Sequence, residues 1–190
     1  MVEDDYDGEF RYDGRPLESL QGLDRDGRVI YIGTFSRTVF SSLRIGYLIA
    51  PQGRLRHSRP QSGYPIVTRL NCSSKRSQSS ISSGIYERYL RRSRRRNTAQ
   101  RQVLLDTIGG CFGSRVEVSG GGAGAHIVLW PRRRVSEEVL IAEAASLGVG
   151  IYGISPYFLN APARTGVMLG YSRMREAEIR EGIRRLAKVF

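Results

Sequence analysis

The hydrophobic positions predict two short strands near the start of the chain, followed by a polar segment. RVIYIGTF at 28–35 is continuous in apolar and β-branched residues, which is typical of a buried strand. IGYLIAP at 45–51 predicts a second strand, which Pro51 ends. The first 28 residues are acidic and rich in turn-forming residues, so we expect a loop there. Residues 54–83 have little hydrophobic periodicity and many serines, which favours a degenerate linker.

From residue 84 onward the pattern predicts helices as well as strands. Apolar positions recur at helical spacing over 85–108, so we expect one long helix, ended by Gly109-Gly110. Ser136 is the expected N-cap of a later amphipathic helix. The remaining elements are predicted as strands at 114–119 and 125–130, a helix at 136–148, strands at 149–154 and 165–171, and a helix at 175–190. This order predicts a compact α/β domain.

The composition limits the class of protein without naming its function. A chain of 190 residues with 40% hydrophobic residues favours a globular protein, and no apolar run approaches the length of a membrane span. Cys72 and Cys111 fit no metal or disulfide spacing, so we expect a reduced, cytoplasmic setting and no metal. His126 lies on a predicted strand, where a structural role is the more common one.

The net charge of +12 comes from one part of the chain. Residues 54–101 hold 13 basic side chains and one acidic one, Glu87, and the rest of the chain nets zero. A basic, non-specific nucleic-acid-binding protein is therefore one open interpretation, and it depends on this segment with its arginine run at 91–96. Arginines on a solvated helix face are the more common reading of such a run.

Three stretches together carry a resemblance to a known family: VEDDYDGEFRYDG at 2–14, VIYIGTFSRTVFSSLRIGYLIAP at 29–51, and ARTGVMLGYSRMREAEIREGIRRLA at 163–187. They resemble the aminotransferase-like domain of MocR/PdxR-type members of the GntR transcription regulators. This resemblance implies an α/β fold of the fold-type I aminotransferase class, in which pyridoxal phosphate (PLP) is the cofactor. The implied protein is a homodimer that responds to a small amine or amino-acid effector, with no membrane association.

The resemblance also implies roles for single residues. Asp4 would pair with the pyridine nitrogen of the cofactor, and Tyr6 would hydrogen-bond the phenolic oxygen of its ring. Ser36 and Arg44 match phosphate ligands, and a hydroxyl with a guanidinium suits a dianionic phosphate. Arg164 matches the arginine that binds the carboxylate of the substrate or effector.

Arg37 departs from the family pattern, which has a lysine at this position. The neutral amine of lysine forms the internal aldimine with PLP, whereas arginine stays protonated and offers no comparable nucleophile. The two lysines of the chain, Lys75 and Lys188, match no family position. We therefore expect no internal aldimine, PLP binding that is non-covalent and weak at most, and a protein that leans away from being an enzyme.

The resemblance divides the chain into four expected regions: a remnant of the PLP-binding large domain at 1–53, a degenerate linker at 54–83, a long interdomain helix at 84–112, and a complete small C-terminal α/β domain at 113–190. We expect a C-terminal fragment that lacks the DNA-binding domain of such a regulator, so DNA would be bound only through that missing domain. A fragment of a class I/II PLP-dependent aminotransferase is the alternative. The stretch EDDYDGEFRYDG resembles the regulators more than the aminotransferases, which favours the interpretation as a regulator fragment.

Overall fold

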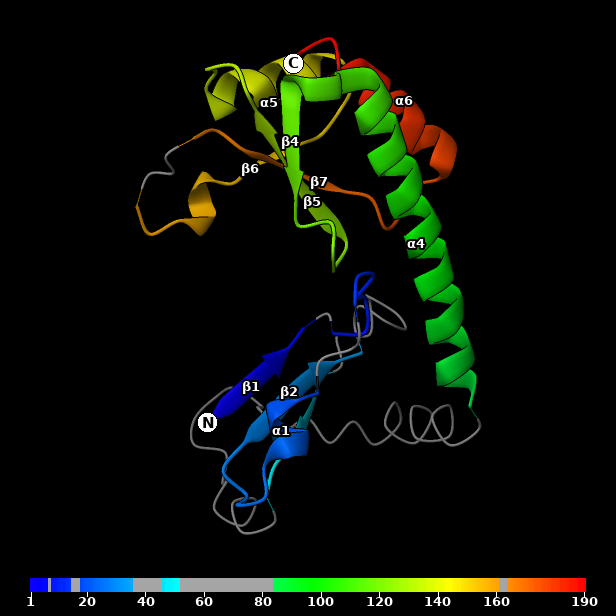
Figure 1. Cartoon of the computed structure of the whole chain (residues 1–190), viewed down its shortest axis with the longest axis vertical. Helices are drawn as coiled ribbons and strands as arrows, with labels where there is room; N and C mark the ends of the chain where they lie inside the picture. Colours follow the sequence, from blue (N-terminus) through cyan, green and yellow to red (C-terminus); the bar gives the residue numbers. More distant parts are fainter. Residues whose placement is uncertain (7, 15–17, 36–45, 52–83, 161–163) are drawn as a thin grey trace, which may run out of the picture. The chain divides into compact units, whose positions relative to one another are not determined.

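A computed structural model describes most of the chain as two compact units. The residues that it describes are 1–6, 8–14, 18–35, 46–51, 84–160 and 164–190. The first unit consists of Met1–Glu9 and Arg15–Ser93, and the second of Phe10–Gly14 and Arg94–Phe190. The predicted linker at 54–83 lies outside the described residues. The predicted α/β class is confirmed, because both sheets and helices are present (Figure 1).

The first unit is built on a three-stranded sheet. Its strands are β1 (Val2–Asp5), β2 (Ile30–Thr34) and β3 (Gly46–Ile49), in the order β1-β2-β3. β1 runs parallel to β2, whereas β3 is antiparallel to it. The short helix α1 (Leu20–Leu23) precedes β2 and is capped by the side chain of Ser19, which accepts a hydrogen bond from the amide of Gly22.

β1 corrects the expectation of a loop over the first 28 residues. Its register with β2 pairs Val2 with Ile30 and Asp5 with Gly33. The Met1 carbonyl accepts a hydrogen bond from the Ile30 amide at 3.0 Å, which starts the pairing. The hydrophobic pattern does not predict this strand, because three of its four residues are acidic. It becomes apparent only from its pairing with β2 in the structure.

The long helix α4 spans Ile85–Phe112 and agrees with the expected helix over 84–112. Its expected end at Gly109-Gly110 is wrong, because the helix continues through both glycines. The end comes at Gly113, whose φ of 54° lies in the left-handed region that favours glycine. The C-terminal half of α4 buries Leu104, Ile108 and Phe112.

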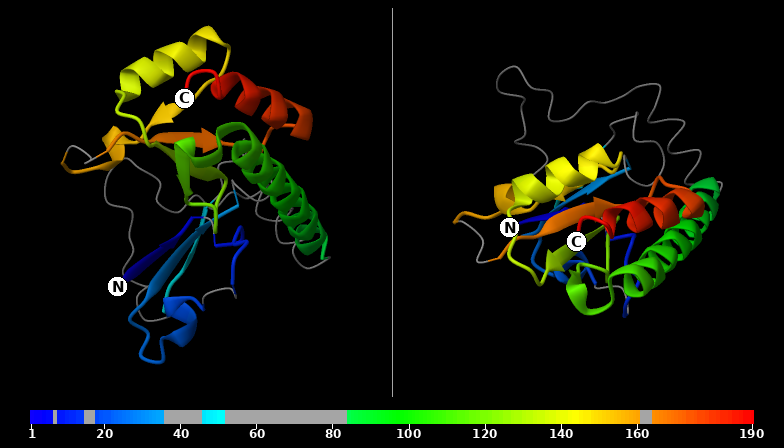
Figure 2. Two further views of the ribbon diagram at one scale, coloured as in Figure 1. Left: turned by 45° about the horizontal axis from the view of Figure 1, so that its top comes forward. Right: turned by 90° about the horizontal axis from the view of Figure 1, so that it is seen from above.

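The second unit has a four-stranded antiparallel sheet with helices against one face (Figure 2). Its strands are β4 (Val116–Ser119), β5 (His126–Pro131), β6 (Tyr152–Gly153) and β7 (Val167–Gly170), in the order β4-β5-β7-β6. The helices are α5 (Glu137–Ser146) and α6 (Glu176–Leu186), with short 3-10 turns at Gly113–Arg115 and Ser155–Tyr157. All six elements expected after residue 113 are therefore present, and Ser136 caps α5 as expected.

The two faces of this sheet differ in character. The core face carries buried residues such as Val116, Leu129 and Val167, and α4, α5 and α6 pack against it through residues such as Ile108, Leu140 and Ile183. Strand alternation places Glu117, Trp130, Met168 and Tyr152 on the opposite face, because Glu117 pairs with Trp130 and Met168 with Tyr152. We call this second surface the outer face.

Residues 10–14, which follow the acidic motif, belong to the second unit. The Gly124 amide donates to the Phe10 carbonyl at 2.8 Å, and the Tyr12 hydroxyl donates to the Gly124 carbonyl at 2.9 Å. Arg101 of α4 pairs with Asp13 at 3.3 Å. The glycine-rich turn between β4 and β5 and residues 10–14 (FRYDG) thus pack together within this unit.

Candidate functional site

The predicted cofactor residues Asp4 and Tyr6 lie at the carboxyl end of β1. Asp4 is exposed, and its register partner Ile32 places it on the same sheet face as Thr34, two residues further along β2. Tyr6 directly follows the strand and is also exposed. Because β1 and β2 are parallel, their carboxyl ends meet at one edge of the sheet, which is the usual place for a ligand in such sheets.

The other predicted cofactor residues are not placed. Ser36, Arg37 and Arg44 lie outside the described residues, as does Lys75. Lys188 follows α6 in the second unit. β2 ends at Thr34, at the edge of the sheet that carries Asp4, and Phe35 is the last described residue before Ser36.

A polar network that the sequence did not indicate lies on the opposite face of the same strands. The Tyr31 hydroxyl donates to Oδ2 of Asp5 at 2.6 Å, and the Gly8 amide donates to Oδ1 at 2.8 Å. The ring of Tyr47 covers Gly33, where any Cβ atom would collide with it. Burial, followed by the hydrogen bonds to Asp5 and Tyr47, raises the pKa of Tyr31 above its ordinary value. Asp5 is therefore engaged in fixing the strands, whereas Asp4 faces away from this network.

Arg164 lies on the outer face of the second sheet, in contact with two side chains. Its Nη1 and Nη2 atoms donate to Glu117 at 2.7 and 3.2 Å, which makes a bidentate ion pair. Its guanidinium carbon lies 4.3 Å from the centroid of the Trp130 ring, within cation–π range. Trp130 is held in turn, because its indole N–H donates to Oγ of Ser119 at 2.7 Å.

The electrostatics of the pair favour both charged forms. The hydrogen bonds and charge of Arg164 hold the pKa of Glu117 below its ordinary value, with a smaller contribution from the charge of Arg132. Glu117 raises the pKa of Arg164 in the same way. Both side chains are about half exposed, at 51% for Arg164 and 48% for Glu117. Sequence reasoning singled out Arg164 and missed Glu117, because a charge on a short strand gives no signal of its partner.

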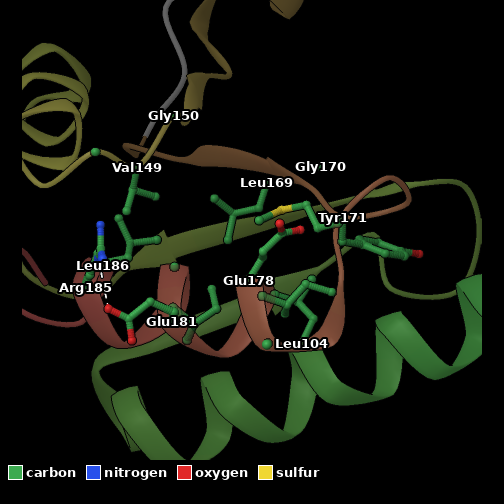
Figure 3. A pocket seen from close by; sticks show the side chains of 16 residues that line it. Leu104, Val149, Gly150, Leu169, Gly170, Tyr171, Glu178, Glu181, Arg185 and Leu186 are labelled. Atoms are coloured by element: carbon green, nitrogen blue, oxygen red, sulfur yellow. Dashed lines mark hydrogen bonds and ion pairs between the residues drawn. The ribbon is translucent and has the colours of Figure 1, made fainter.

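The second unit also contains an apolar pocket of about 550 Å³, and Arg164 is not among its described lining residues (Figure 3). Leu169 and Tyr171 form one wall, and Leu104 and Leu186 contribute from helices. The ion pair between Glu181 and Arg185 lies at its edge at 2.8 Å. The charged side chains among its described lining residues are engaged in ion pairs, Glu178 with Arg175 and Glu181 with Arg185.

The remaining candidates are weak. His126 is exposed at the start of β5, and its ring lies over Gly170 of β7. Within the described ranges, no group of three or more histidine, cysteine or acidic side chains could hold a metal ion. In the same part of the chain, no helix is long and apolar enough to cross a membrane.

Comparison with known proteins identifies bacterial regulators as relatives, although no family model matches the chain. The chain is 39% identical to the uncharacterized HTH-type transcriptional regulator YhdI of Bacillus subtilis, covering 98% of this chain and 40% of YhdI. It is 34% identical to the probable rhizopine catabolism regulatory protein MocR of Rhizobium meliloti, covering 100% and 38%. It is 30% identical to the pyridoxine biosynthesis transcriptional regulator PdxR of Corynebacterium glutamicum, covering 95% and 39%. The chain thus spans about two fifths of the length of these relatives.

Solved structures with the same fold are aminotransferases. A multiple substrate aminotransferase from Thermococcus profundus matches with a TM-score of 0.78 at 22% identity, covering 99% of this chain and 47% of that one. The α-aminoadipate aminotransferase LysN from Thermus thermophilus, complexed with N-(5'-phosphopyridoxyl)-L-leucine, matches with a TM-score of 0.78 at 23% identity, covering 99% and 49%. At these identities the matches show the fold alone. The structural matches confirm the expected partial aminotransferase fold.

Proposed function

The chain is a homologue of the MocR- and PdxR-type transcriptional regulators, and from this premise we propose that it is the effector-binding part of such a regulator. In this proposal it binds PLP without a covalent link and senses a small amine or amino acid. The observation that carries the proposal is the position of Asp4 at the carboxyl end of a strand parallel to β2. Of the predicted phosphate ligands, Ser36 follows β2 closely in sequence and Arg44 shortly precedes β3.

The chemistry of the described donors fits the cofactor. Asp4 offers an exposed carboxylate, which would hold the pyridine nitrogen in its protonated form, and Tyr6 offers a phenol for the ring oxygen. Ser36 and Arg44 would bind the phosphate, and Arg37 would add a further donor. When bound, PLP supplies an electron sink to an attached amine. The residues of this chain bind and orient it but provide no amine at position 37.

Arg164 is the proposed anchor for the carboxylate of an effector. The Arg164 guanidinium presents two parallel donors, and it is held against the ring of Trp130. Trp130, Met168 and Tyr152 on the outer face offer an apolar surface for the rest of a small ligand. A carboxylate contact of this kind fits an amino-acid effector better than a simple amine.

The proposal for the longer protein includes a homodimer, a separate helix-turn-helix domain that binds DNA, and a cytoplasmic location. The names of the relatives support the DNA-binding role, because YhdI and PdxR are HTH-type regulators. An aminotransferase fragment is the weaker alternative, since the aminotransferase structures are similar at only 22–23% identity.

Titration with PLP followed by borohydride reduction tests the proposed cofactor site. We expect weak, reversible binding by absorbance and no pyridoxyl adduct on the peptide that contains Arg37, by mass spectrometry. Arg37→Lys should acquire an adduct on that peptide, because lysine restores the missing amine. A stoichiometric adduct on Lys75 or Lys188 in the unchanged chain would contradict the proposal.

The matched control for this experiment is a second exposed aspartate of the first unit. Asp4→Asn should weaken PLP binding about tenfold, the typical effect of losing a hydrogen bond to a charged group. Asp26→Asn removes the same charge at an exposed ion pair with Arg28 and should leave PLP binding unchanged. Equal affinities for the two variants would rule out Asp4 as the pyridine partner.

A further inference from the structure

We propose that Glu117 is an internal competitor for the carboxylate site at Arg164, so that it sets how strongly the site responds to carboxylate ligands. This inference rests on the proposed role of Arg164 as the effector anchor. Glu117 occupies both donors that a ligand carboxylate would use, at 2.7 and 3.2 Å. A ligand carboxylate that binds this pair of donors must therefore displace Glu117, whereas a ligand without a carboxylate leaves the ion pair intact.

The fold holds Glu117 and Trp130, which both contact Arg164, in fixed positions on the sheet. Glu117 lies directly opposite Trp130 in the β4–β5 ladder, so its backbone cannot withdraw from the ring on which Arg164 stacks. Trp130 is fixed by its hydrogen bond to Ser119, two residues along β4 from Glu117. Arg164 therefore stays on the outer face when Glu117 leaves it, and a ligand carboxylate meets a prepared guanidinium.

A second cation makes the displacement feasible. Arg132, which follows β5, already acts on Glu117 through its charge and lowers the pKa of that carboxyl. When a ligand takes Arg164, the Glu117 carboxylate remains in the field of Arg132 and in solvent. Because the ion pair is about half exposed, its strength is that of a surface pair. We therefore expect Glu117 to weaken carboxylate binding by about two- to fivefold, which corresponds to the range for such pairs.

Trp130 provides the probe for this inference, because it is the only tryptophan of the chain. The chain is titrated with sodium acetate at constant ionic strength, and the response is followed by Trp130 fluorescence and by the NMR signal of its indole N–H. Glu117→Gln should lower the apparent dissociation constant for acetate about two- to fivefold relative to the unchanged chain. Ethylammonium chloride, which has no carboxylate, should change the Trp130 signals equally little in the unchanged chain and in Glu117→Gln.

Two further variants separate the inference from the proposed function. Arg164→Gln, combined with Glu117→Gln, should abolish the saturable acetate response. If acetate still binds equally well to the double variant, Arg164 is not the anchor and the proposed function loses its carboxylate site. If the double variant loses binding but Glu117→Gln binds acetate no more tightly than the unchanged chain, or shows no saturable response, the competition is overturned. Glu143→Gln removes the same charge from α5 and controls for the general effect of charge.

Discussion

Two adjacent aspartates, Asp4 and Asp5, lie in different environments, because successive side chains of a strand point to opposite faces of the sheet. Asp5 accepts hydrogen bonds from the Tyr31 hydroxyl and the Gly8 amide, and it thereby ties β1 to β2. Asp4 points to the other face, where it remains exposed. The hydrogen bonds of Asp5 fix the orientation of the carboxyl end of β1, and they therefore also fix the direction in which Asp4 points.

Tyr31→Phe tests this tie. The substitution removes the hydroxyl that donates to Asp5 at 2.6 Å and leaves a partly buried carboxylate with one donor fewer. We expect a loss of about 1–2 kcal/mol in the free energy of unfolding, measured in urea, the usual cost for a hydrogen bond to a charged group at a partly exposed site. Tyr157→Phe, at an exposed tyrosine, should change it by less than about 0.5 kcal/mol. Equal effects of both substitutions would show that the hydroxyl of Tyr31 adds nothing.

At this scale the sequence predicts residues that belong to a motif and misses those that act through a partner. Asp4, Tyr6 and Arg164 are recognisable because each lies in a stretch similar to the regulators. Tyr31 lies in such a stretch but has no role implied by the resemblance, and Glu117 lies outside all three stretches. The roles of both arise from neighbours that the fold brings across the ladder. The positions of Ser36, Arg37 and Arg44 remain predictions.

Among the elements, α4 shows how tertiary packing overrides a local stop signal. A Gly-Gly pair predicts a helix end, yet Ile108 and Phe112 on either side of it are both buried in the core of the second unit. Burying Phe112 against this core favours the helical path through the glycines, since their helix propensity costs only about 1 kcal/mol each. The residue that does end the helix is Gly113, with its positive φ.

Alanine substitutions at these glycines distinguish the two interpretations. No neighbour lies within 4 Å of a Cβ atom built at Gly109 or Gly110. Gly109→Ala and Gly110→Ala should each raise the free energy of unfolding by about 0.5–1 kcal/mol, because alanine is the better helix former. Gly113→Ala should lower it, because its φ of 54° strains any residue with a Cβ. Destabilisation by all three substitutions, in thermal or urea unfolding, would mean that the helix ends where the sequence predicts.

The elements after residue 113 were predictable because their hydrophobic patterns, caps and turns agree with one another. Ser136 begins α5 as expected, and α6 has the strong amphipathic pattern that buries Ile179, Ile183 and Leu186. β1 was not predictable in this way. A strand of mostly acidic residues pairs with β2 because backbone hydrogen bonds, and not apolar side chains, hold it there.

Across the whole molecule, charge is organised as local pairs on a basic chain. The net charge is +12, yet several glutamates of the second unit have close arginine partners. Three of these pairs are Glu117 with Arg164, Glu178 with Arg175, and Glu181 with Arg185. In each case the arginine holds the pKa of the glutamate below its ordinary value. On a chain with this excess of positive charge, every paired glutamate also reduces repulsion among the arginines.

These lowered pKa values predict acid sensitivity of the second unit. A carboxylate whose pKa is lower in the folded state than in the unfolded state stabilises the fold above its unfolded pKa, about 4.3 for glutamate. That contribution is lost as the pH falls below this value and through the folded pKa. We therefore expect an unfolding free energy that is nearly constant between about pH 5 and 7 and that falls steeply below about pH 4. Urea unfolding followed by Trp130 fluorescence at a series of pH values measures it.

Acid also protonates unpaired carboxylates and raises the net positive charge, so the pairs must be separated from this general effect. Glu178→Gln removes a glutamate that accepts hydrogen bonds from both the backbone and the side chain of Arg175 at the start of α6. Glu143→Gln removes the same charge from α5, where no arginine partner is recorded for it among the described residues. The pairing account requires that Glu178→Gln be less stable at neutral pH and lose less stability on acidification than Glu143→Gln. Parallel pH profiles for the two variants would assign the acid sensitivity to net charge alone.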